Sequence, residues 1–544
     1  MTTEHSSSEY EQIREDFQWD RPISYNFATA VVDRWALSPQ KRALAYVTES
    51  GKYCERTFSE LSIESKKLAA GLYSMGLRRG DTLLLILSRE VEWWVCMIAC
   101  IRMGVIVSPG TTQLSAKDIL YRADAAGAKC VICNAEVATK LDAVRDELPV
   151  AMSGILVGAP RPDWTGYDYL VSGQHPEFNE EETAAKDPAL CFFTSGTTGF
   201  PKMCIHSHDY AHSHINTGKY WLDLSPNDLH WNISDTGWAK SAWSSLFGPW
   251  NMGATVFVYQ AVAFKPSDIL RLLSEYAITT MCGAPTLYRL LVQENLSQFS
   301  FKALRHCVGA GEPLNPEIIE TWKSHSGITI RDGYGQTETC LLCASQPSFE
   351  PRYGSMGKPA PGVDLEVIDE SGSPCDINEE GDIAVRVGIH APLGMFSCYR
   401  DDEERTAACF KGDFYITGDR AYKDEDGYFW FVGRADDVIL SSGYRIGPFE
   451  VESALLEHEA IVESAVVSSP DKTRGEIVKA FIVLAQGYSP SSDLTAEIQD
   501  FVKNTTAPYK YPRSIEFVDH LPKTVSGKIR RIELRDREWA KVSY

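Results

Sequence analysis

The sequence predicts a large layered α/β body followed by a smaller α+β domain. Apolar runs alternate with amphipathic helical stretches over about 400 of the 544 residues, as in a parallel sheet covered by helices. Glycine-rich polar segments follow several of the apolar runs. Near residue 420 the pattern changes to short alternating elements.

The first βαβ pattern begins at residue 82. The apolar run 82–88 is followed by a helical stretch at 89–104 and by a second apolar run at 105–109. Similar helix and strand pairs follow at 116–134 and 267–285. Since ligands of parallel sheets lie beyond the carboxyl ends of the strands, the polar segments there are candidate binding loops. They are residues 109–113, 194–202 and 308–313.

The C-terminal part begins with a predicted hairpin at 421–437 that turns at an Asp-Gly pair. We expect an N-terminal domain at 1–434, a hinge at 435–437 and a C-terminal domain at 438–544. The elements expected in the second domain are helices at 447–458 and 494–504 and strands at 462–469, 478–485 and 514–519.

Composition excludes some classes of partner. The net charge of −21 disfavours a nucleic acid or an anionic membrane surface. The longest apolar stretch, 93–107, contains Arg102 and is shorter than the roughly 20 residues of a membrane helix, so no span is expected. The first 20 residues have no apolar core and carry acidic side chains, which predicts a cytoplasmic location. We expect a monomer or a small homo-oligomer.

Residues 194–202 read TSGTTGFPK, which has the glycines, hydroxyls and lysine of a phosphate-binding loop. The spacing differs from the G-x-x-x-x-G-K-[ST] of nucleotide P-loops, and alone the segment would fit a linker as well. Four further segments lie downstream in the chain. They are RDGYGQTET at 331–339, YITGD at 415–419, GRADDVILSSGYRIGPFEVE at 433–452 and LPKTVSGKIRR at 521–531.

These five segments, in this order, resemble the core motifs of the acyl-adenylate-forming superfamily, and most closely those of medium-chain acyl-CoA synthetases. The resemblance implies a mobile C-terminal domain and a two-step ligase. A carboxylic acid and ATP would give acyl-AMP and pyrophosphate, and coenzyme A would then give acyl-CoA and AMP. The implied acid is medium-chain, branched or aromatic, and the implied cofactors are ATP, Mg²⁺ and coenzyme A.

The resemblance also implies an ATP site. Hydroxyls and backbone N–H groups of the 194–202 loop would grip the β- and γ-phosphates, and Lys202 would add charge. Tyr334 would stack on adenine, Asp419 would accept from the ribose, and Glu338 would hold Mg²⁺. The expected ATP residues are Thr194, Ser195, Gly196, Thr197, Thr198, Gly199, Lys202, Asp332, Gly333, Tyr334, Gly335, Gln336, Thr337, Asp419, Arg434 and Lys528.

Lys528 matches the lysine that, in relatives, bridges the attacking carboxylate and the α-phosphate. Thr337 and Glu338 are counted with it as catalytic. Asp436 matches the hinge about which the small domain turns between the two steps.

The turned domain would present a different face for the thioester step. The residues expected along the coenzyme A path are Gln113, Ser442, Gly443, Tyr444 and Arg474, and Arg445 is expected on the AMP phosphate. The expected acyl pocket consists of Trp238, Ala239, Lys240, Ala310 and Gly335, with Lys240 pointing away or limiting the tunnel. Small residues at Ala239, Ala310 and Gly335 suggest a deep pocket.

Two other functions are compatible with parts of the pattern. A sibling enzyme would pass the acyl group to a carrier protein or an amine, but the Gly443 channel, Gln113 and Arg474 favour coenzyme A. A non-catalytic adenylate-binding protein would not need Lys528. The ligase is therefore the leading hypothesis.

Overall fold

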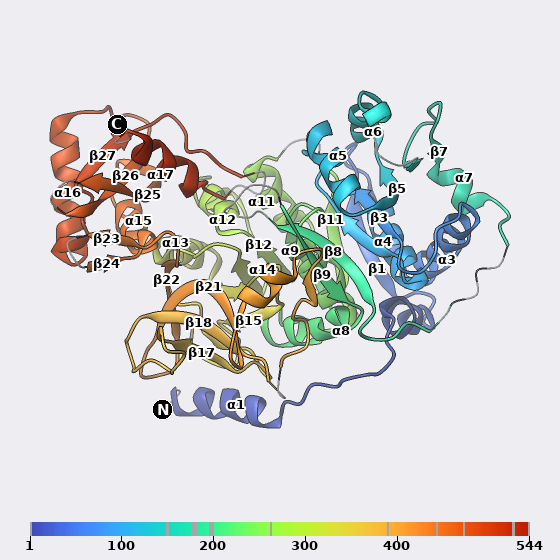
Figure 1. Cartoon of the computed structure of the whole chain (residues 1–544), viewed down its shortest axis with the longest axis horizontal. Coiled ribbons are helices and arrows are strands. Elements are labelled where there is room, and N and C mark those ends of the chain that lie inside the picture. The colour runs from blue at the N-terminus through green and yellow to red at the C-terminus, as the bar shows by residue number, and fades with distance from the viewer. Residues whose placement is uncertain are drawn as a thin grey trace.

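The computed structural model describes residues 3–147, 152–176, 178, 180, 182–194, 201–261, 264–388, 391–441, 444–471, 474–524 and 528–541, with only the backbone for residues 3–8. The described residues form four sheets (Figure 1). The C-terminal sheet and its helices form a lobe at the left of Figure 1, and helix α1 (Thr3–Asp16) lies beneath strands β17 (Leu365–Ile368) and β18 (Gly381–Arg386). Among the described residues, no helix has the length and apolar character to cross a bilayer.

The first sheet contains the predicted βαβ unit. Strands β3 and β4 are parallel and are joined by helix α4 (Val91–Met103), whose side chains are almost all buried. That burial on every side explains why the helix reads as a continuous apolar run. The strand order is β19 (Cys398–Tyr399), β9 (Lys202–Ser207), β8 (Pro188–Thr194), β4 (Ile106–Pro109), β3 (Thr82–Ile86), β5 (Ala128–Cys133), β6 (Ser153–Leu156), β7 (Thr165–Gly166).

The second sheet has nine strands and a parallel centre, in which β10, β12, β13 and β14 run side by side. Their carboxyl ends therefore meet at one edge, as expected for a binding site. The strand order is β16 (Lys358–Pro359), β15 (Leu341–Ala344), β14 (Ile330–Gly335), β13 (His306–Ala310), β12 (Thr280–Gly283), β10 (Leu229–Ile233), β11 (Thr255–Tyr259), β1 (Arg42–Val47), β2 (Tyr53–Thr57).

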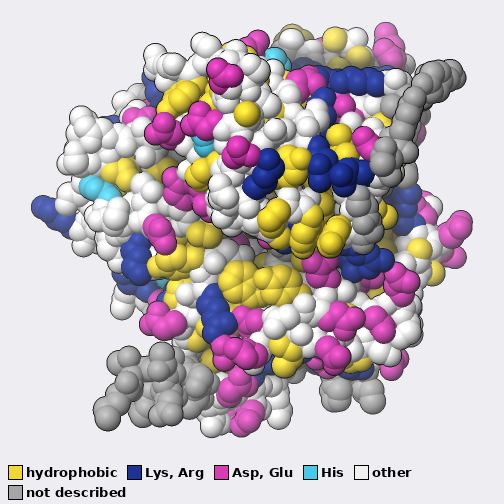
Figure 2. All heavy atoms as spheres, turned by 90° about the vertical axis from the view of Figure 1, so that its left-hand side faces the viewer, with side chains coloured by type: hydrophobic (Ala, Val, Ile, Leu, Met, Phe, Trp, Pro, Cys, Tyr) yellow, Lys and Arg dark blue, Asp and Glu magenta, His cyan; other side chains and the backbone are white. Residues whose placement is uncertain are grey.

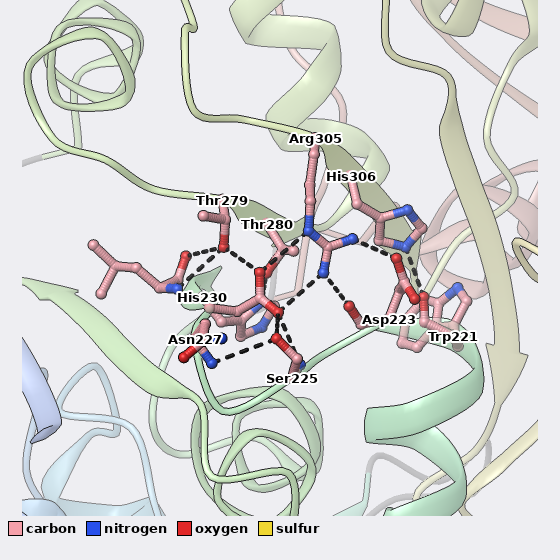
Figure 3. Close-up of polar contacts among 11 residues, drawn as sticks. Trp221, Asp223, Ser225, Asn227, His230, Thr279, Thr280, Arg305 and His306 are labelled. Carbon is pink, nitrogen blue, oxygen red and sulfur yellow. Dashed lines mark hydrogen bonds and ion pairs between the residues drawn. The ribbon is translucent and has the colours of Figure 1, made fainter. Parts of the chain in front are cut away.

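A polar cluster ties the amino ends of these strands together (Figure 3). The guanidinium of Arg305 donates to the buried carboxylate of Asp228 at 3.0 and 3.2 Å, and the Thr279 hydroxyl donates to the same group at 2.8 Å. Burial opposes ionisation of Asp228, but the hydrogen bonds from Arg305, Ser225 and Thr279 outweigh it and lower its pKa. The cluster holds the strands in register, which positions the residues at their opposite ends.

The third sheet contains the predicted hairpin, with β21 antiparallel to β22. Its strands are β17 (Leu365–Ile368), β18 (Gly381–Arg386), β20 (Phe410–Lys411), β21 (Phe414–Lys423) and β22 (Phe429–Arg434). The fourth sheet forms the small domain after the predicted hinge. Its strands are β23 (Ile439–Ser441), β24 (Tyr444–Ile446), β25 (Ile461–Asp471), β26 (Gly475–Leu484) and β27 (Ser514–Phe517).

Helices cover these sheets, and the mixed arrangement confirms the predicted fold class. The main helices of the body are α3 (Phe58–Ser74), α5 (Ala116–Ala125), α6 (Ala135–Asp142), α7 (Tyr167–Ser172), α8 (Asp209–Asn216), α11 (Pro266–Glu275), α12 (Pro285–Val292), α13 (Pro316–Ser326) and α14 (Glu403–Ala408). Those of the small domain are α15 (Pro448–Leu456), α16 (Ser492–Thr505) and α17 (Arg531–Ala540). The sequence reasoning did not predict α17 or the N-terminal α1 (Thr3–Asp16).

Helix α1 belongs to the folded body. The Tyr10 side chain is 1% exposed and its hydroxyl donates to the carbonyl of Pro359 at 3.0 Å. Its ring packs edge-on against Phe349, and the ammonium of Lys358 lies 5.2 Å from the ring centre. The N-terminal segment is therefore part of the folded structure.

Candidate functional site

The expected phosphate loop joins two antiparallel strands. Thr194 ends β8 and Lys202 begins β9, and the two residues pair across the ladder. The segment is thus a hairpin connection, unlike the strand-to-helix turn of a nucleotide P-loop. The ammonium of Lys202 lies 4.8 Å from the centre of the Tyr399 ring. Ser195, Gly196, Thr197, Thr198 and Gly199 lie outside the described residues.

Asp419 is the centre of a hydrogen-bond network that four predicted residues share. Its Oδ2 accepts from the Tyr334 hydroxyl at 2.6 Å and from Gln336 Nε2 at 2.7 Å, and its Oδ1 accepts from Arg434 Nη1 at 3.0 Å. Asp419 is 5% exposed. Strand β14 supplies Tyr334, while the β21–β22 hairpin supplies Asp419 and Arg434, which face each other in register. The structure thereby joins residues 85 positions apart.

Glu338 and Thr337 follow β14 and are each held by a side chain from another element. The Tyr399 hydroxyl donates to Glu338 Oε1 at 2.6 Å, and burial together with the charge of Glu338 raises the pKa of Tyr399. The ring N–H of His206 on β9 donates to the carbonyl of Thr337 at 2.7 Å. The sequence did not indicate Tyr399 or His206, because neither residue lies in one of the five motif segments.

Lys528 lies at the end of β13, although it belongs to the small domain. Its Cε is 4.0 Å from the position that a Cβ on Gly311 would take. Burial opposes ionisation of the neighbouring Glu312, but Arg289 and the charge of Lys528 lower its pKa. Glu312 is a third residue that was missed, although it lies in the loop at 308–313. Two domains therefore contribute to one site.

Lys240 bridges two strand ends. Its ammonium donates to the carbonyls of Gly283 and Ala310, at 2.8 and 2.7 Å, which are the last residues of β12 and β13. Burial lowers the pKa of Lys240, and the nearby charge of Lys528 adds to this effect. The two roles first considered for Lys240 did not include this bridge.

Two glycines of β14 are required by packing. A Cβ on Gly335 would lie 2.3 Å from the carbonyl oxygen of Cys340 and 2.9 Å from Cη2 of Trp243. A Cβ on Gly333 would lie 2.4 Å from the ring of Trp221. Any side chain at either position would need its neighbours to move. The absence of a side chain at Gly335 therefore has a structural reason in addition to the expected open pocket.

Asp332 is buried beside them. Its Oδ1 accepts from the backbone N–H of Gly333 at 2.9 Å, and burial raises its pKa to about 7. These contacts hold the strand, and the expected contact of Asp332 with ATP stays a prediction. Among the remaining pocket residues, Ala239 and Ala310 are buried and Trp238 is half-buried at the start of α9 (Ala239–Ala242).

Among the described residues, those expected for the thioester step, on coenzyme A or on the AMP phosphate, do not join the ATP residues in this arrangement. Arg445 donates to Glu370 Oε1 at 3.1 Å, just beyond β17. The Tyr444 ring stacks on Tyr509 with centres 4.2 Å apart. The Arg474 backbone N–H donates to Asp471, and the Gln113 side chain is exposed on the loop after β4. Ser442 and Gly443 lie outside the described residues.

Comparison with known proteins gives two family matches. Residues 32–399 match the AMP-binding enzyme family, and residues 450–528 match the AMP-binding enzyme C-terminal domain. The human mitochondrial acyl-coenzyme A synthetase ACSM3 is 47% identical over 99% of this chain and 94% of its own length. The mitochondrial acyl-coenzyme A synthetase ACSM4 of Rattus norvegicus is 50% identical over 96% and 92%, respectively.

Solved structures agree with these matches. The anthranilate CoA ligase AuaEII, in complex with anthranoyl-AMP, superposes with a TM-score of 0.88 at 30% identity, covering 96% of this chain and 99% of that one. A benzoate CoA ligase from Burkholderia xenovorans LB400 gives a TM-score of 0.83 at 28% identity, over 94% of this chain and 100% of that one.

The relatives overturn the predicted location. Both curated enzymes are named as mitochondrial, so the cytoplasmic prediction is wrong. It depended on the composition of the first 20 residues. Most of these form helix α1, whose Tyr10 is buried against the body, so their composition reflects packing and does not report the compartment.

Proposed function

The chain belongs to the AMP-binding enzyme family, and from this premise we propose how its site carries out the reaction. It is an acyl-CoA synthetase, an AMP-forming ligase whose substrates are a carboxylic acid, ATP and coenzyme A. This confirms the resemblance to the medium-chain enzymes. The proposals below concern the roles of individual residues, the domain movement and the acid.

The observation that carries the mechanism is the position of Lys528 at the end of β13, close to Gly311, Glu312 and Lys240. In the first step both the attacking carboxylate and the α-phosphate are anionic. An ammonium between them offsets charge as the bond to phosphorus forms and the bond to pyrophosphate breaks. Lys202, across the hairpin from Thr194, would hold the departing pyrophosphate. The position of Lys528 beside Gly311 and Glu312 supports this role in acyl-AMP formation.

The Asp419 network would bind the nucleoside. Three donors already occupy the Asp419 carboxylate, which has about four acceptor positions. A ribose hydroxyl would therefore use the remaining position or displace Gln336. Because Tyr334 is held by its hydroxyl, its ring plane is set in advance for stacking on adenine.

Mg²⁺ would bind at Glu338 together with phosphate oxygens. Among the described residues no group of three His, Cys, Asp or Glu side chains could hold a metal ion. This fits Mg²⁺, which usually takes one or two carboxylates, water and substrate phosphates. Tyr399 occupies one oxygen of Glu338 and leaves the other available. When bound, the ion neutralises phosphate charge.

For the second step, we propose that the 438–544 domain turns about Asp436 relative to the 1–434 domain. The turn would withdraw Lys528 and bring residues 442–445 to the acyl-AMP, with Arg445 on its phosphate. In the described arrangement Arg445 is held by an ion pair with the exposed Glu370, and such pairs contribute at most about 1 kcal/mol. Breaking this contact would hinder the rotation little.

We propose a medium-chain, branched or aromatic acid as the substrate. Two structural neighbours are an anthranilate CoA ligase and a benzoate CoA ligase, and both acids are aromatic. The face in Figure 2 carries acidic, basic and hydrophobic side chains side by side, and the net charge of −21 disfavours a nucleic-acid partner. The expectation of a monomer or small homo-oligomer stays a prediction.

A panel of acids tests the proposal: acetate to decanoate, with isobutyrate and benzoate, assayed for coenzyme A-dependent AMP production. Highest activity with acids of six or more carbons or with benzoate is the expected result. Highest activity with acetate would refute the acid class. AMP production that needs acid and ATP but is unaffected by coenzyme A would instead point to the sibling enzymes that use a carrier protein or an amine.

A further inference from the structure

The linker between the two domains is fixed on its body side. The backbone N–H of Ala435 donates to the carbonyl of Gly418 at 3.0 Å. Arg434, the last residue of β22, bonds Asp419 at 3.0 Å and the carbonyl of Thr417 at 3.4 Å. The chain is therefore part of the third sheet up to Ala435.

The linker is also fixed on the side of the small domain, by Arg535 of helix α17. The Arg535 guanidinium donates to the backbone carbonyl of Asp436 and, at 3.0 Å, to Asp437 Oδ1. Both side chains of the ion pair are mostly buried, with exposures of 21% and 18%. Such a pair is screened less by solvent than a surface pair.

Helix α17 is itself firmly attached to the small domain. Leu534 is buried in a cluster with Ala465, Val467 and Phe481 of the fourth sheet. The buried carboxylate of Glu538 accepts from Lys479 of β26 at 2.8 Å. Arg535 therefore moves with the small domain as one body.

One residue remains between the two fixed segments. Rotation about the φ and ψ angles of Asp436 carries its own carbonyl and the whole of Asp437 along with the small domain, so the Arg535 bonds survive it. Contacts between the domains, such as Asn315 Nδ2 to Ser453 Oγ at 3.0 Å and Arg445 to Glu370, would have to break in any such rotation. Within residues 434–437, two further contacts cross this pivot. They are the hydrogen bond from Asp437 N to Arg434 O at 3.0 Å and the 3.5 Å pair between Arg434 Nε and Asp436 Oδ1.

We propose that Arg535 is a positioning residue that joins the Asp436 carbonyl and Asp437 to the small domain, and so confines the domain rotation to the backbone of Asp436. The inference rests on the proposed rotation, and it adds the contact that restricts this rotation to one residue. Without Arg535, residues 436–438 would form a longer flexible joint. Lys528 and residues 442–445 would then each spend less time in their working positions.

Arg535→Ala tests this with kinetics of the separate half-reactions. We expect kcat to fall about tenfold both for pyrophosphate release and for thioester formation from supplied acyl-AMP. KM for ATP should change less than twofold, because the residues expected to hold the nucleoside, Tyr334 and Asp419, lie on the body. Arg535→Lys should recover part of the loss, since an ammonium can still reach one of the two acceptors. Wild-type kcat in both half-reactions would overturn the proposal.

Arg537→Ala is the matched control, because Arg537 lies on the same helix, is 49% exposed and pairs with Glu516 of β27. It should leave both rates unchanged, and an equal loss there would show that α17 matters only for stability. Urea unfolding of each variant checks that it is folded. If Arg535→Ala does not fold, Asp437→Asn, which weakens the same contact from the other side, should reproduce the kinetic loss, and wild-type rates there would refute the clamp.

A distance measurement tests the role of Arg535 independently of the proposed reaction. Spin labels at Tyr169→Cys on α7 and Glu497→Cys on α16 report the distance between the two domains by double electron–electron resonance. Both sites are accessible to a label, because the native side chains are about two-thirds exposed. We expect narrow distributions in the wild-type background and a broad one with Arg535→Ala. Identical distributions would overturn the clamp. If the wild-type enzyme formed no acyl-AMP, the proposed function would fall while this measurement still tested Arg535.

Discussion

Replacing Lys528 with alanine separates the two half-reactions. The structure places the Lys528 side chain beside Gly311 and Glu312, where the acid and the α-phosphate would meet. Removing one preorganised donor from a transition state costs about 100- to 1000-fold in rate. Because Lys528 is exposed to solvent, we expect the lower end, about 100-fold.

The assay compares pyrophosphate release from acid and ATP with acyl-CoA formation from supplied acyl-AMP. Only the first rate should fall, since the second step uses the turned domain. Lys523→Ala is the control: Lys523 lies in the same sequence motif, pairs with Ile529 in an isolated β-bridge, and its ammonium pairs with Glu463 at 2.6 Å. It should leave both rates near wild type. Equal losses of both half-reactions in Lys528→Ala would refute the assignment of Lys528 to adenylation alone.

Three further predictions follow from contacts around the site. Tyr399→Phe removes the 2.6 Å hydrogen bond to Glu338, so pyrophosphate release should fall about tenfold and need more Mg²⁺, and an unchanged Mg²⁺ titration would contradict this. Gly335→Ala should already lower the free energy of unfolding by about 1–3 kcal/mol in urea, because its Cβ would meet the Cys340 carbonyl at 2.3 Å. Gly335→Trp should lose stability in the same way and, in addition, should shift the substrate preference to shorter acids. Full activity of this variant on hexanoate would show that Gly335 does not line the acyl pocket. The pKa of Asp332 is raised to about 7 in the folded state. The protonated carboxyl therefore gives its full stabilisation below the unfolded-state pKa near 3.8, and this stabilisation is lost as the pH rises through 7. Asp332→Asn should therefore be more stable than wild type at pH 8, with a difference that shrinks towards pH 5 in urea unfolding, and a difference independent of pH would contradict the shift.

Much of the fold could be predicted because period and polarity are local properties of the chain. The run at 82–88 and the helix at 89–104 appear as β3 and α4, and the Asp-Gly turn appears between β21 and β22. Helix α17 was missed because its many charged residues hide a narrow apolar side, on which Leu534 is the main buried contact. Helix α1 was missed for a similar reason, because its residues are mostly polar and charged, and the segment was considered only for its bearing on location.

The motifs could be found because each combines residue types that a packed core does not favour. Their partners could not be found in the same way. Tyr399, His206 and Glu312 are ordinary residues in sequence, and only the pairing of β9 with β19 and the end of β13 bring them to Glu338, Thr337 and Lys528. For Gly335 the sequence suggested one reason for a glycine, an open acyl pocket. The structure adds a second reason, because the carbonyl of Cys340 leaves no room for a Cβ.

The sequence by itself determined the fold class, the order of the motifs and the chemistry that their side chains can perform, because these depend on residue types and short spacings. Only the tertiary structure decided which side chains share hydrogen bonds, that Lys240 joins two strand ends, and that Arg535 clamps the linker 99 positions earlier in the chain. These contacts depend on the relative placement of whole sheets, which results from the burial of many side chains together and leaves no local signal in the chain.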